Sequence, residues 1–147
     1  MKKAWIFGIC LALGVNAYAA VEAQKQIPCP FGWSVQPNPS ADNSLSYLTA
    51  DGNLAISVTS IRPTSDDKLS SESYARVASQ QMQCTLPVKS NLIEDAWSFN
   101  CERDEVEGIV YGSSSELVLL AISGRSPDTE PQLEEFVRFL ADQAKNH

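Results

Sequence analysis

Histidine and the motifs that most enzymes and metal sites depend on are nearly absent from this sequence. The 147 residues include one histidine, His147, at the end of the chain. A serine or cysteine nucleophile needs an imidazole held in place, and residues at chain ends are poorly held. There is no Cys-x-x-Cys pair, no His-Glu-x-x-His pattern, no acidic calcium loop and no glycine-rich phosphate loop. The sequence therefore predicts no catalytic residue, no metal and no cofactor.

Long apolar runs are missing after the first 20 residues. The longest later run is Leu117–Ile122, far short of the roughly 20 residues that a helix needs to span a bilayer. The start of the chain, by contrast, has two lysines, a mostly apolar stretch at 4–15 and the tripeptide Ala17-Tyr18-Ala19. These parts are typical of a secretory signal peptide, residues 1–19, that is cut after Ala19. We therefore expect a bacterial protein that is periplasmic or secreted, without stable membrane insertion once the leader is removed.

Basic side chains are few, with 11 Lys and Arg against 18 Asp and Glu. Removal of Lys2 and Lys3 with the leader leaves 9 basic against 18 acidic side chains, hence a formal net charge of −9 over residues 20–147. Such a surface repels the phosphates of nucleic acids and anionic lipids, and it favours basic partners at low salt. Net negative charge also simply keeps an exported protein soluble. We expect another protein, possibly a basic one, as the partner and no nucleic acid.

Three cysteines remain after leader cleavage, Cys29, Cys84 and Cys101, and an oxidising compartment favours pairing of two of them. The residues that alternate on both sides of the turn region 90–95 indicate which two cysteines form the pair. A hairpin centred there sets Val88 opposite Trp97, Leu86 opposite Phe99 and Cys84 opposite Cys101. Directly opposed residues have Cα atoms roughly 4.5 to 5.5 Å apart, a separation that a disulfide tolerates.

We therefore predict a disulfide between Cys84 and Cys101 on the core-facing side of a hairpin. Cys29, between Pro28 and Pro30, is left as the unpaired thiol. Whether it is free, buried or bridged to another molecule stays open.

The remaining periodicities predict the order of the elements. A Pro-rich segment, 20–44, holds a short edge strand, and a hairpin over 45–61 turns at Asp51-Gly52 as a two-residue type I′ turn. A helix at 71–83 follows Ser70 as N-cap, then four strands in a meander, then a helix after Thr129 with Gln132 completing a capping box. The apolar stripes are Tyr74, Val77, Ala78 and Met82 on the first helix, and Leu133, Phe136, Val137, Leu140 and Ala144 on the second.

Hairpin connections imply antiparallel pairing. The expected fold is therefore α+β, a single curved antiparallel β-sheet with two amphipathic helices packed on it, centred on residues 45–147.

This element order and several local patterns resemble one known family. The patterns are Gly-Trp at 32–33, the Asp-Gly hairpin, Leu-Ser-Ser-Glu-Ser-Tyr-Ala at 69–75 and Leu-Glu-Glu-Phe-Val-Arg-Phe-Leu at 133–140. Over residues 31–143 the chain resembles the PsbP-like family, which includes photosystem accessory proteins, a Ran-binding nuclear-import factor and bacterial envelope proteins of the DcrB type. The resemblance implies a fold and a habit of binding other proteins, without a reaction or a functional residue to carry over. The two opposed cysteines depart from the family's usual pattern.

Two features are candidates for a partner surface. The first is a cluster of carboxylates in a predicted turn that also contains Arg103: Glu102, Asp104, Glu105 and Glu107. Paired carboxylates can serve acid–base catalysis, but a turn favours a solvated tip or an acidic knob for a basic partner. The second is Trp33 in the Pro-rich edge, although aromatic residues of strands also pack in cores.

The function indicated by these features is that of an exported, non-enzymatic periplasmic protein that binds another macromolecule through a sheet face or its acidic rim. A sharper version is an acidic inhibitor or immunity protein against a basic hydrolase or toxin. The competing class is a carrier of a small hydrophobic ligand, or an enzyme, with a pocket between helix and sheet. A deep cavity with convergent polar groups near Trp33 or the acidic cluster would favour that class, whereas a filled core would not.

Overall fold

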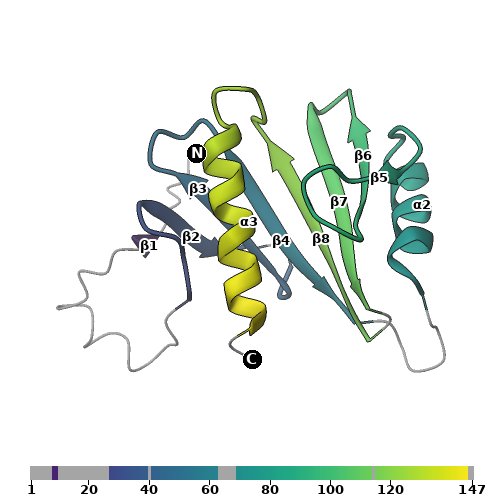
Figure 1. Ribbon diagram of the computed structural model, residues 1–147, viewed down its shortest axis with the longest axis horizontal. Helices are drawn as coiled ribbons and strands as arrows, with labels where there is room; N and C mark the ends of the chain where they lie inside the picture. The colour runs from purple at the N-terminus through teal and green to yellow at the C-terminus, as the bar shows by residue number, and fades with distance from the viewer. Residues whose placement is uncertain (1–7, 10–26, 40, 63–68, 114, 146–147) are drawn as a thin grey trace.

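The protein folds as an antiparallel sheet with two helices (Figure 1). The computed structural model describes residues 8–9, 27–39, 41–62, 69–113 and 115–145. The elements are β1 (Gly8–Ile9), β2 (Trp33–Pro37), β3 (Ser44–Thr49), β4 (Ala55–Ile61), α2 (Ser71–Gln81), β5 (Val88–Lys89), β6 (Trp97–Cys101), β7 (Val106–Ser113), β8 (Glu116–Ser123) and α3 (Glu130–Lys145). The predicted order of strand, hairpin, helix, four-strand meander and helix is confirmed from β2 onward. The prediction that β2 is an edge strand is wrong, because β1, which was not predicted, pairs with its outer side.

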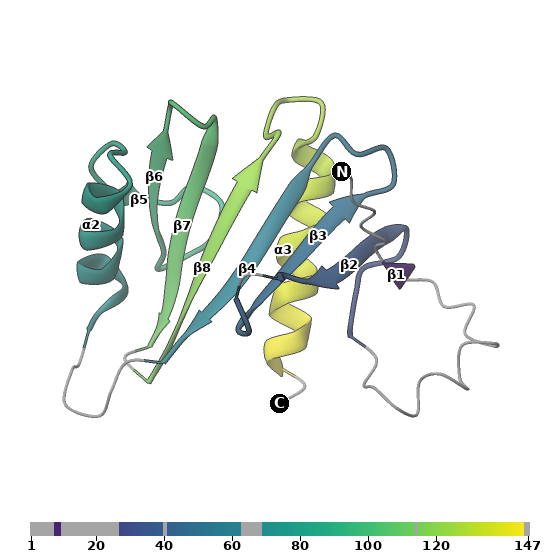
Figure 2. The ribbon, with the colours of Figure 1, turned by 180° about the vertical axis from the view of Figure 1, so that it is seen from behind.

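The strand order is β1-β2-β3-β4-β8-β7-β6-β5, and every neighbouring pair is antiparallel. After β4 the chain passes through α2 to the far edge, and the meander then returns so that β8 pairs with β4. The α+β class is therefore confirmed. The sheet is open from edge to edge and neither closes nor curls, so the curved sheet expected from the sequence is replaced by an open one (Figures 1 and 2).

The two helices lie on opposite faces of the sheet. Ile109 and Val110 are adjacent on β7 and point to opposite faces, as successive strand residues do. Ile109 belongs to the buried cluster that includes Phe136 of α3, and Val110 belongs to the cluster that includes Ala75 of α2. Each helix thus covers part of one face only, α3 over the middle of the sheet and α2 over β6 and β7 (Figure 2).

The core under α3 is built around aromatic rings. Phe136 stacks on Trp33 with ring centroids 5.1 Å apart and meets the edge of Tyr47 at 5.0 Å. Trp33 is only 4% exposed. Trp33 therefore cannot belong to a partner surface, and its prediction as a candidate for one is wrong. The strand pairing explains why, because β2 joins β3 in the sheet and turns the ring inward.

The core under α2 is built from small residues. Ala75, Ala78 and Ser79 are buried, whereas Val77 and Met82 of the predicted stripe are nearly half exposed. Small side chains let the helix approach the sheet, where the large Phe99 fills the space. The prediction that Ser70 is the N-cap of this helix is confirmed, since its hydroxyl accepts a hydrogen bond from the Ser73 N–H at 3.0 Å.

The hairpin of β3 and β4 is present, but its turn is not the predicted one. The connection is longer than two residues and runs over 50–54, with the Gly52 N–H donating to the Thr49 carbonyl and only Gly52 in the left-handed region (φ 76°). The Asp51 carboxylate explains the difference. It accepts hydrogen bonds from the Asn53 N–H and the Thr49 hydroxyl, at 3.0 and 2.8 Å, and these bonds stabilise the wider turn.

The predicted disulfide between Cys84 and Cys101 is confirmed, with a Cα–Cα distance of 4.3 Å. The register beyond it is shifted by one residue from the prediction. Val88 lies opposite Ser98 and Lys89 opposite Trp97. Pro87 has no N–H to donate to the neighbouring strand, and the chain has one residue more than its partner strand near this proline. Because a shift of one residue reverses the face of every following side chain, Val88 points to the other face, where it is 62% exposed.

Cys29 lies in a disulfide and is not a free thiol. The prediction of an unpaired thiol is therefore wrong. The other half of that bridge lies outside the described residues.

Helix α3 begins where the sequence predicts, but Thr129 does not act through the expected capping box. Its hydroxyl accepts from the Ser126 N–H at 2.9 Å and donates to the Gly124 carbonyl at 2.8 Å. Thr129 thus braces the loop that leads into the helix, while its carbonyl accepts the first helical bond from the Leu133 N–H.

Candidate functional site

Three segments that connect strands and helices lie together at one end of the sheet (Figure 1). They are the β3–β4 turn, the β6–β7 turn and the β8–α3 loop, at the top of Figure 1. Ser123 pairs with Val106 on one side, and Gly124 lies against the Asn53 carbonyl on the other, which brings the three segments side by side. A Cβ on Gly124 would lie 2.1 Å from that carbonyl oxygen, so only glycine fits there.

This end of the molecule is acidic. We call it the acidic end and define it by five exposed carboxylates, those of Asp51, Glu102, Asp104, Glu105 and Asp128. Within the described part of the chain none of them forms an ion pair, and Arg103 is the only cationic residue exposed in these three connections. The pKa of Asp51 lies below its usual value, mainly because its carboxylate accepts from the Asn53 N–H and the Thr49 hydroxyl. That carboxylate therefore stays charged into mildly acidic solution.

Glu107 is not part of this exposed cluster, which corrects the grouping made from the sequence. It lies on β7, its side chain is 13% exposed, and its carboxylate is 2.6 Å from a guanidinium nitrogen of Arg125. Its other oxygen accepts from the Ser98 hydroxyl at 2.6 Å. Because β7 begins at Val106, Glu107 is already within the sheet and its side chain lies on the α3 face.

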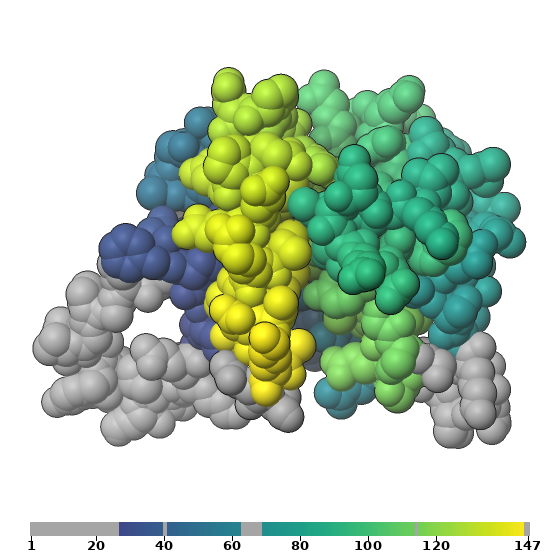
Figure 3. Space-filling view, in the orientation of Figure 1, coloured from purple at the N-terminus to yellow at the C-terminus, as the bar shows by residue number. Residues whose placement is uncertain are grey.

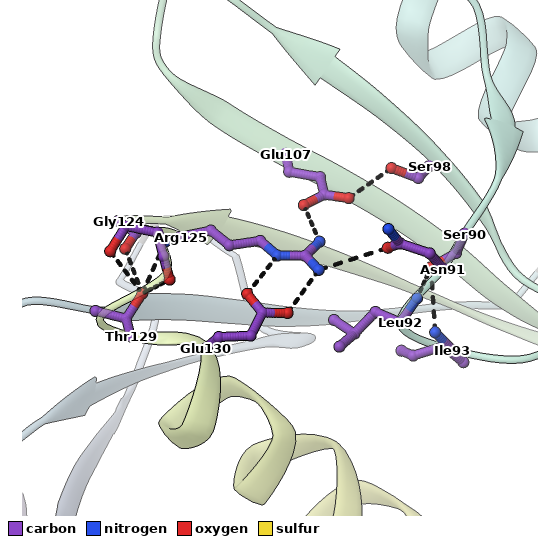
Figure 4. A network of polar contacts seen from close by, with 11 residues as sticks. Ser90, Asn91, Leu92, Ile93, Ser98, Glu107, Gly124, Arg125, Thr129 and Glu130 are labelled. Atoms are coloured by element: carbon purple, nitrogen blue, oxygen red, sulfur yellow. Dashed lines mark hydrogen bonds and ion pairs between the residues drawn. The ribbon is translucent and has the colours of Figure 1, made fainter.

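Arg125 connects three separate segments (Figure 4). Its guanidinium donates to both carboxylate oxygens of Glu130 in the first turn of α3, at 3.1 and 2.8 Å, and to Glu107 on β7. A longer contact, 3.5 Å, reaches the side-chain oxygen of Asn91 in the 90–96 segment. The two ion pairs thus join the helix start to the sheet, and the contact with Asn91 adds the 90–96 segment.

The carboxylates of this network are held by Arg125. The hydrogen bonds from Arg125 hold the pKa of Glu130 below its usual value, and the same carboxylates raise the pKa of Arg125 further above its own. Both Glu107 and Glu130 form ion pairs with the guanidinium. An open hollow of about 520 Å³ lies beside them, lined by Asn100, Glu102, Glu105 and Arg125 among others. We interpret the network as a structural clamp under the acidic end.

A second feature lies at the opposite end of β7 and β8. There the C-terminal half of α3 leaves a groove of about 670 Å³ over the sheet, with predominantly apolar walls. The walls come from α3, from the ends of β7 and β8, from β4 and from Ile93. This is the helix–sheet pocket that the sequence offered as an alternative, although it lies near neither Trp33 nor the acidic end.

The sequence located part of these sites. It brought Glu102, Asp104 and Glu105 together correctly and misplaced Glu107 and Trp33, while His147 lies outside the described residues. Arg125 was missed. The acidic residue at the start of α3 was a signal for a nearby cation, but nothing in the sequence linked Arg125 to Glu107, 18 residues away.

Comparison of the chain with models of protein families, with curated proteins and with solved structures found no match. The described residues contain no group of His, Cys, Asp or Glu side chains placed to hold a metal ion. None of the helices in the described part of the chain has the length and apolar character needed to cross a membrane.

Proposed function

We propose that this is an exported protein of the bacterial envelope that binds a basic macromolecule, most simply another protein, through its acidic end. The observation that carries the proposal is the gathering of five exposed carboxylates from three connections, with Arg103 as the opposing charge. Carboxylates arranged in this way speed encounter with a positively charged partner and select against negatively charged ones.

Two further observations support the proposed compartment. The first 19 residues have the composition of a secretory leader. The disulfide between Cys84 and Cys101 belongs to a class of bond that persists in oxidising compartments such as the periplasm. The PsbP-like placement is part of the same proposal, and it rests on the order of strands and helices.

We propose a binding role in preference to a catalytic one for the acidic end. Glu102, Asp104 and Glu105 are solvated, and the partly exposed carboxylates of Glu107 and Glu130 are held by Arg125. A general acid or base needs a carboxyl group that is neither fully solvated nor locked in an ion pair. The sharper candidate, an acidic inhibitor or immunity protein against a basic hydrolase or toxin, uses the same surface.

A charge-reversal experiment tests the proposal. The variant Glu102→Lys/Asp104→Lys/Glu105→Lys inverts the β6–β7 tip. The matched control is Glu94→Lys/Glu135→Lys/Asp142→Lys, which makes the same change in net charge at exposed positions away from that tip. Both proteins are expressed with their leaders, and partners are trapped by crosslinking in intact cells.

We expect the wild type and the control to trap the same partner and the tip variant to lose it, with the purified complex weakening as salt is added. Equal trapping by all three proteins would refute the proposal. For the inhibitor version, inhibition of a lysozyme should follow the same order, and a lysozyme unaffected by the wild type at low salt counts against that version.

A further inference from the structure

The two halves of α3 contact the sheet differently. In the first half Leu133 and Phe136 are fully buried. From Val137 onward the contact is looser: Val137 and Leu140 are only partly buried, and Ala141 and Ala144 are exposed although they line the groove. Alanine side chains are too short to reach the sheet at these positions, so the helix leaves open space between itself and the strands.

The space is a groove of a size that suits a small molecule. Its volume of about 670 Å³ falls within the roughly 300–1,000 Å³ that is typical of ligand pockets. Figure 3 shows its surroundings on one face of the molecule: α3 in yellow, the 88–96 segment in green beside it, and the end of the β7–β8 hairpin below them. Val58 and Val118 contribute to its floor from the sheet.

Tyr111 places a hydrogen-bond donor in this predominantly apolar lining. Tyr111 is partly buried and lines the groove, yet its hydroxyl makes no hydrogen bond with any described residue. The other desolvated tyrosine, Tyr47, donates its hydroxyl proton to the Pro28 carbonyl at 3.2 Å. Burial raises the pKa of Tyr111 to about 12, so its proton stays in place at any physiological pH. No buried side-chain nitrogen or oxygen among the described residues lacks a partner, so the Tyr111 hydroxyl is open to solvent in the groove and available to donate to a bound acceptor.

The charges at the groove mouth favour a neutral ligand. Glu116 is the only ionisable side chain other than Tyr111 among the described residues that line the groove. It is 3.9 Å from Arg62, which balances its charge. A ligand carboxylate would meet Glu116 without a cation of its own, whereas an ester, amide or ketone oxygen would accept the Tyr111 proton without a charge conflict.

From this arrangement we propose that the groove between α3 and the sheet binds a neutral amphiphile, with its apolar body along Val137 and Leu140 and a hydrogen-bond acceptor at Tyr111. This site is separate from the acidic end, at the opposite ends of β7 and β8. It makes the protein a carrier or sensor of a small molecule in addition to any macromolecular partner.

Fluorescence of N-phenyl-1-naphthylamine, a neutral apolar probe, tests the site in the purified exported protein under non-reducing conditions. We expect saturable binding with one probe per chain. Ala141→Phe fills the groove from an exposed helix position and should weaken probe binding at least tenfold. The matched control, Gln80→Phe, adds the same ring at an exposed position of α2 and should leave probe binding unchanged.

Competition with methyl decanoate and with decanoate separates the role of Tyr111 from simple hydrophobicity. The ester should displace the probe better than the anion. Tyr111→Phe keeps the ring and removes the hydroxyl, so we expect it to weaken the ester about fivefold and to leave the probe nearly unchanged. Non-saturable probe binding, equal binding by Ala141→Phe, or a preference for the anion would each overturn the inference. The charge-reversed tip variant should bind the probe normally, so failure of one proposal does not imply failure of the other.

Discussion

Removal of the Arg125 side chain should destabilise the protein far more than removal of an exposed arginine. Arg125 is 22% exposed and makes ion pairs with Glu107 and Glu130. Arg125→Met keeps the length of the side chain and removes the charge. It leaves Glu107, 13% exposed, without a cation inside the sheet.

The expected loss follows from burial. Breaking a fully buried ion pair costs about 3–5 kcal/mol because one charge stays behind uncompensated, while exposed pairs are worth about 0–1 kcal/mol. Arg125 and Glu107, with side chains 22% and 13% exposed, lie between these two limits, so we expect a loss of about 2–3 kcal/mol at pH 7. Arg76→Met is the control, since Arg76 pairs with Glu72 on the exposed side of α2 and should cost under about 1 kcal/mol.

Chemical denaturation at pH 7 measures both variants, and a second change tests the mechanism. Glu107→Gln added to Arg125→Met removes the stranded charge, so the double variant should be more stable than Arg125→Met alone. Equal losses for Arg125→Met and Arg76→Met, or no recovery in the double variant, would refute the interpretation of the network as a buried clamp.

The same network predicts a dependence on pH. The pKa of Glu130 is lowered in the folded state by Arg125, so the folded state binds fewer protons at this group than the unfolded chain. Its stabilising contribution is therefore complete above the unfolded pKa, near pH 4.5, and is lost as the pH falls through the folded value. Arg125→Met should abolish that part of the acid sensitivity, which denaturation curves between pH 3 and 7 would detect.

Three other changes have expected outcomes, all measured by thermal or denaturant unfolding. Replacing Cys84 and Cys101 together by alanine should cost about 3 kcal/mol, because the bridge closes a loop with a sequence separation of 17; peptide mapping without reduction should recover the two cysteines in one linked pair. Gly108→Ala should cost about 1–3 kcal/mol, since a Cβ there would lie 2.5 Å from the ring of Phe99; a neutral effect would show that the ring has room to move. Phe136→Ala should cost about 3–5 kcal/mol, as it removes the ring on which the aromatic core of α3 is built; a smaller cost than that of Gly108→Ala would contradict this description of the core.

The two proposed sites differ in what each requires of the fold. The acidic end needs three connections to meet, which depends on β8 returning to pair with β4. The groove needs only the second half of α3 and the strands below it. Binding of a neutral ligand and binding of a basic partner are therefore separable by mutation, and the protein could be tested for coupling between them by measuring probe affinity with and without the partner.

Errors in the sequence interpretation have local physical causes. The register after Cys84 was predicted from strict alternation, and Pro87 breaks that alternation because it adds a residue without an N–H for the ladder. The Asp51 side chain made bonds that favour a wider turn than the Asp-Gly pair suggests. The helix stripe at Val77 and Met82 was wrong because α2 lies at the edge of the sheet, where only Ala75, Ala78 and Ser79 face the strands closely enough to be buried.

The amino-acid sequence by itself determined the order of the strands from β2 onward and of the two helices, the antiparallel hairpins and the partner of Cys84, because these depend on periodicity, turn residues and contacts between neighbouring segments. The tertiary structure alone decided that the helices take opposite faces, that Trp33 is buried, that Arg125 joins Glu107 to Glu130, and that a groove opens under Ala141. Each of these depends on where the meander returns to the sheet, and that choice is made by packing between segments that are distant in the chain.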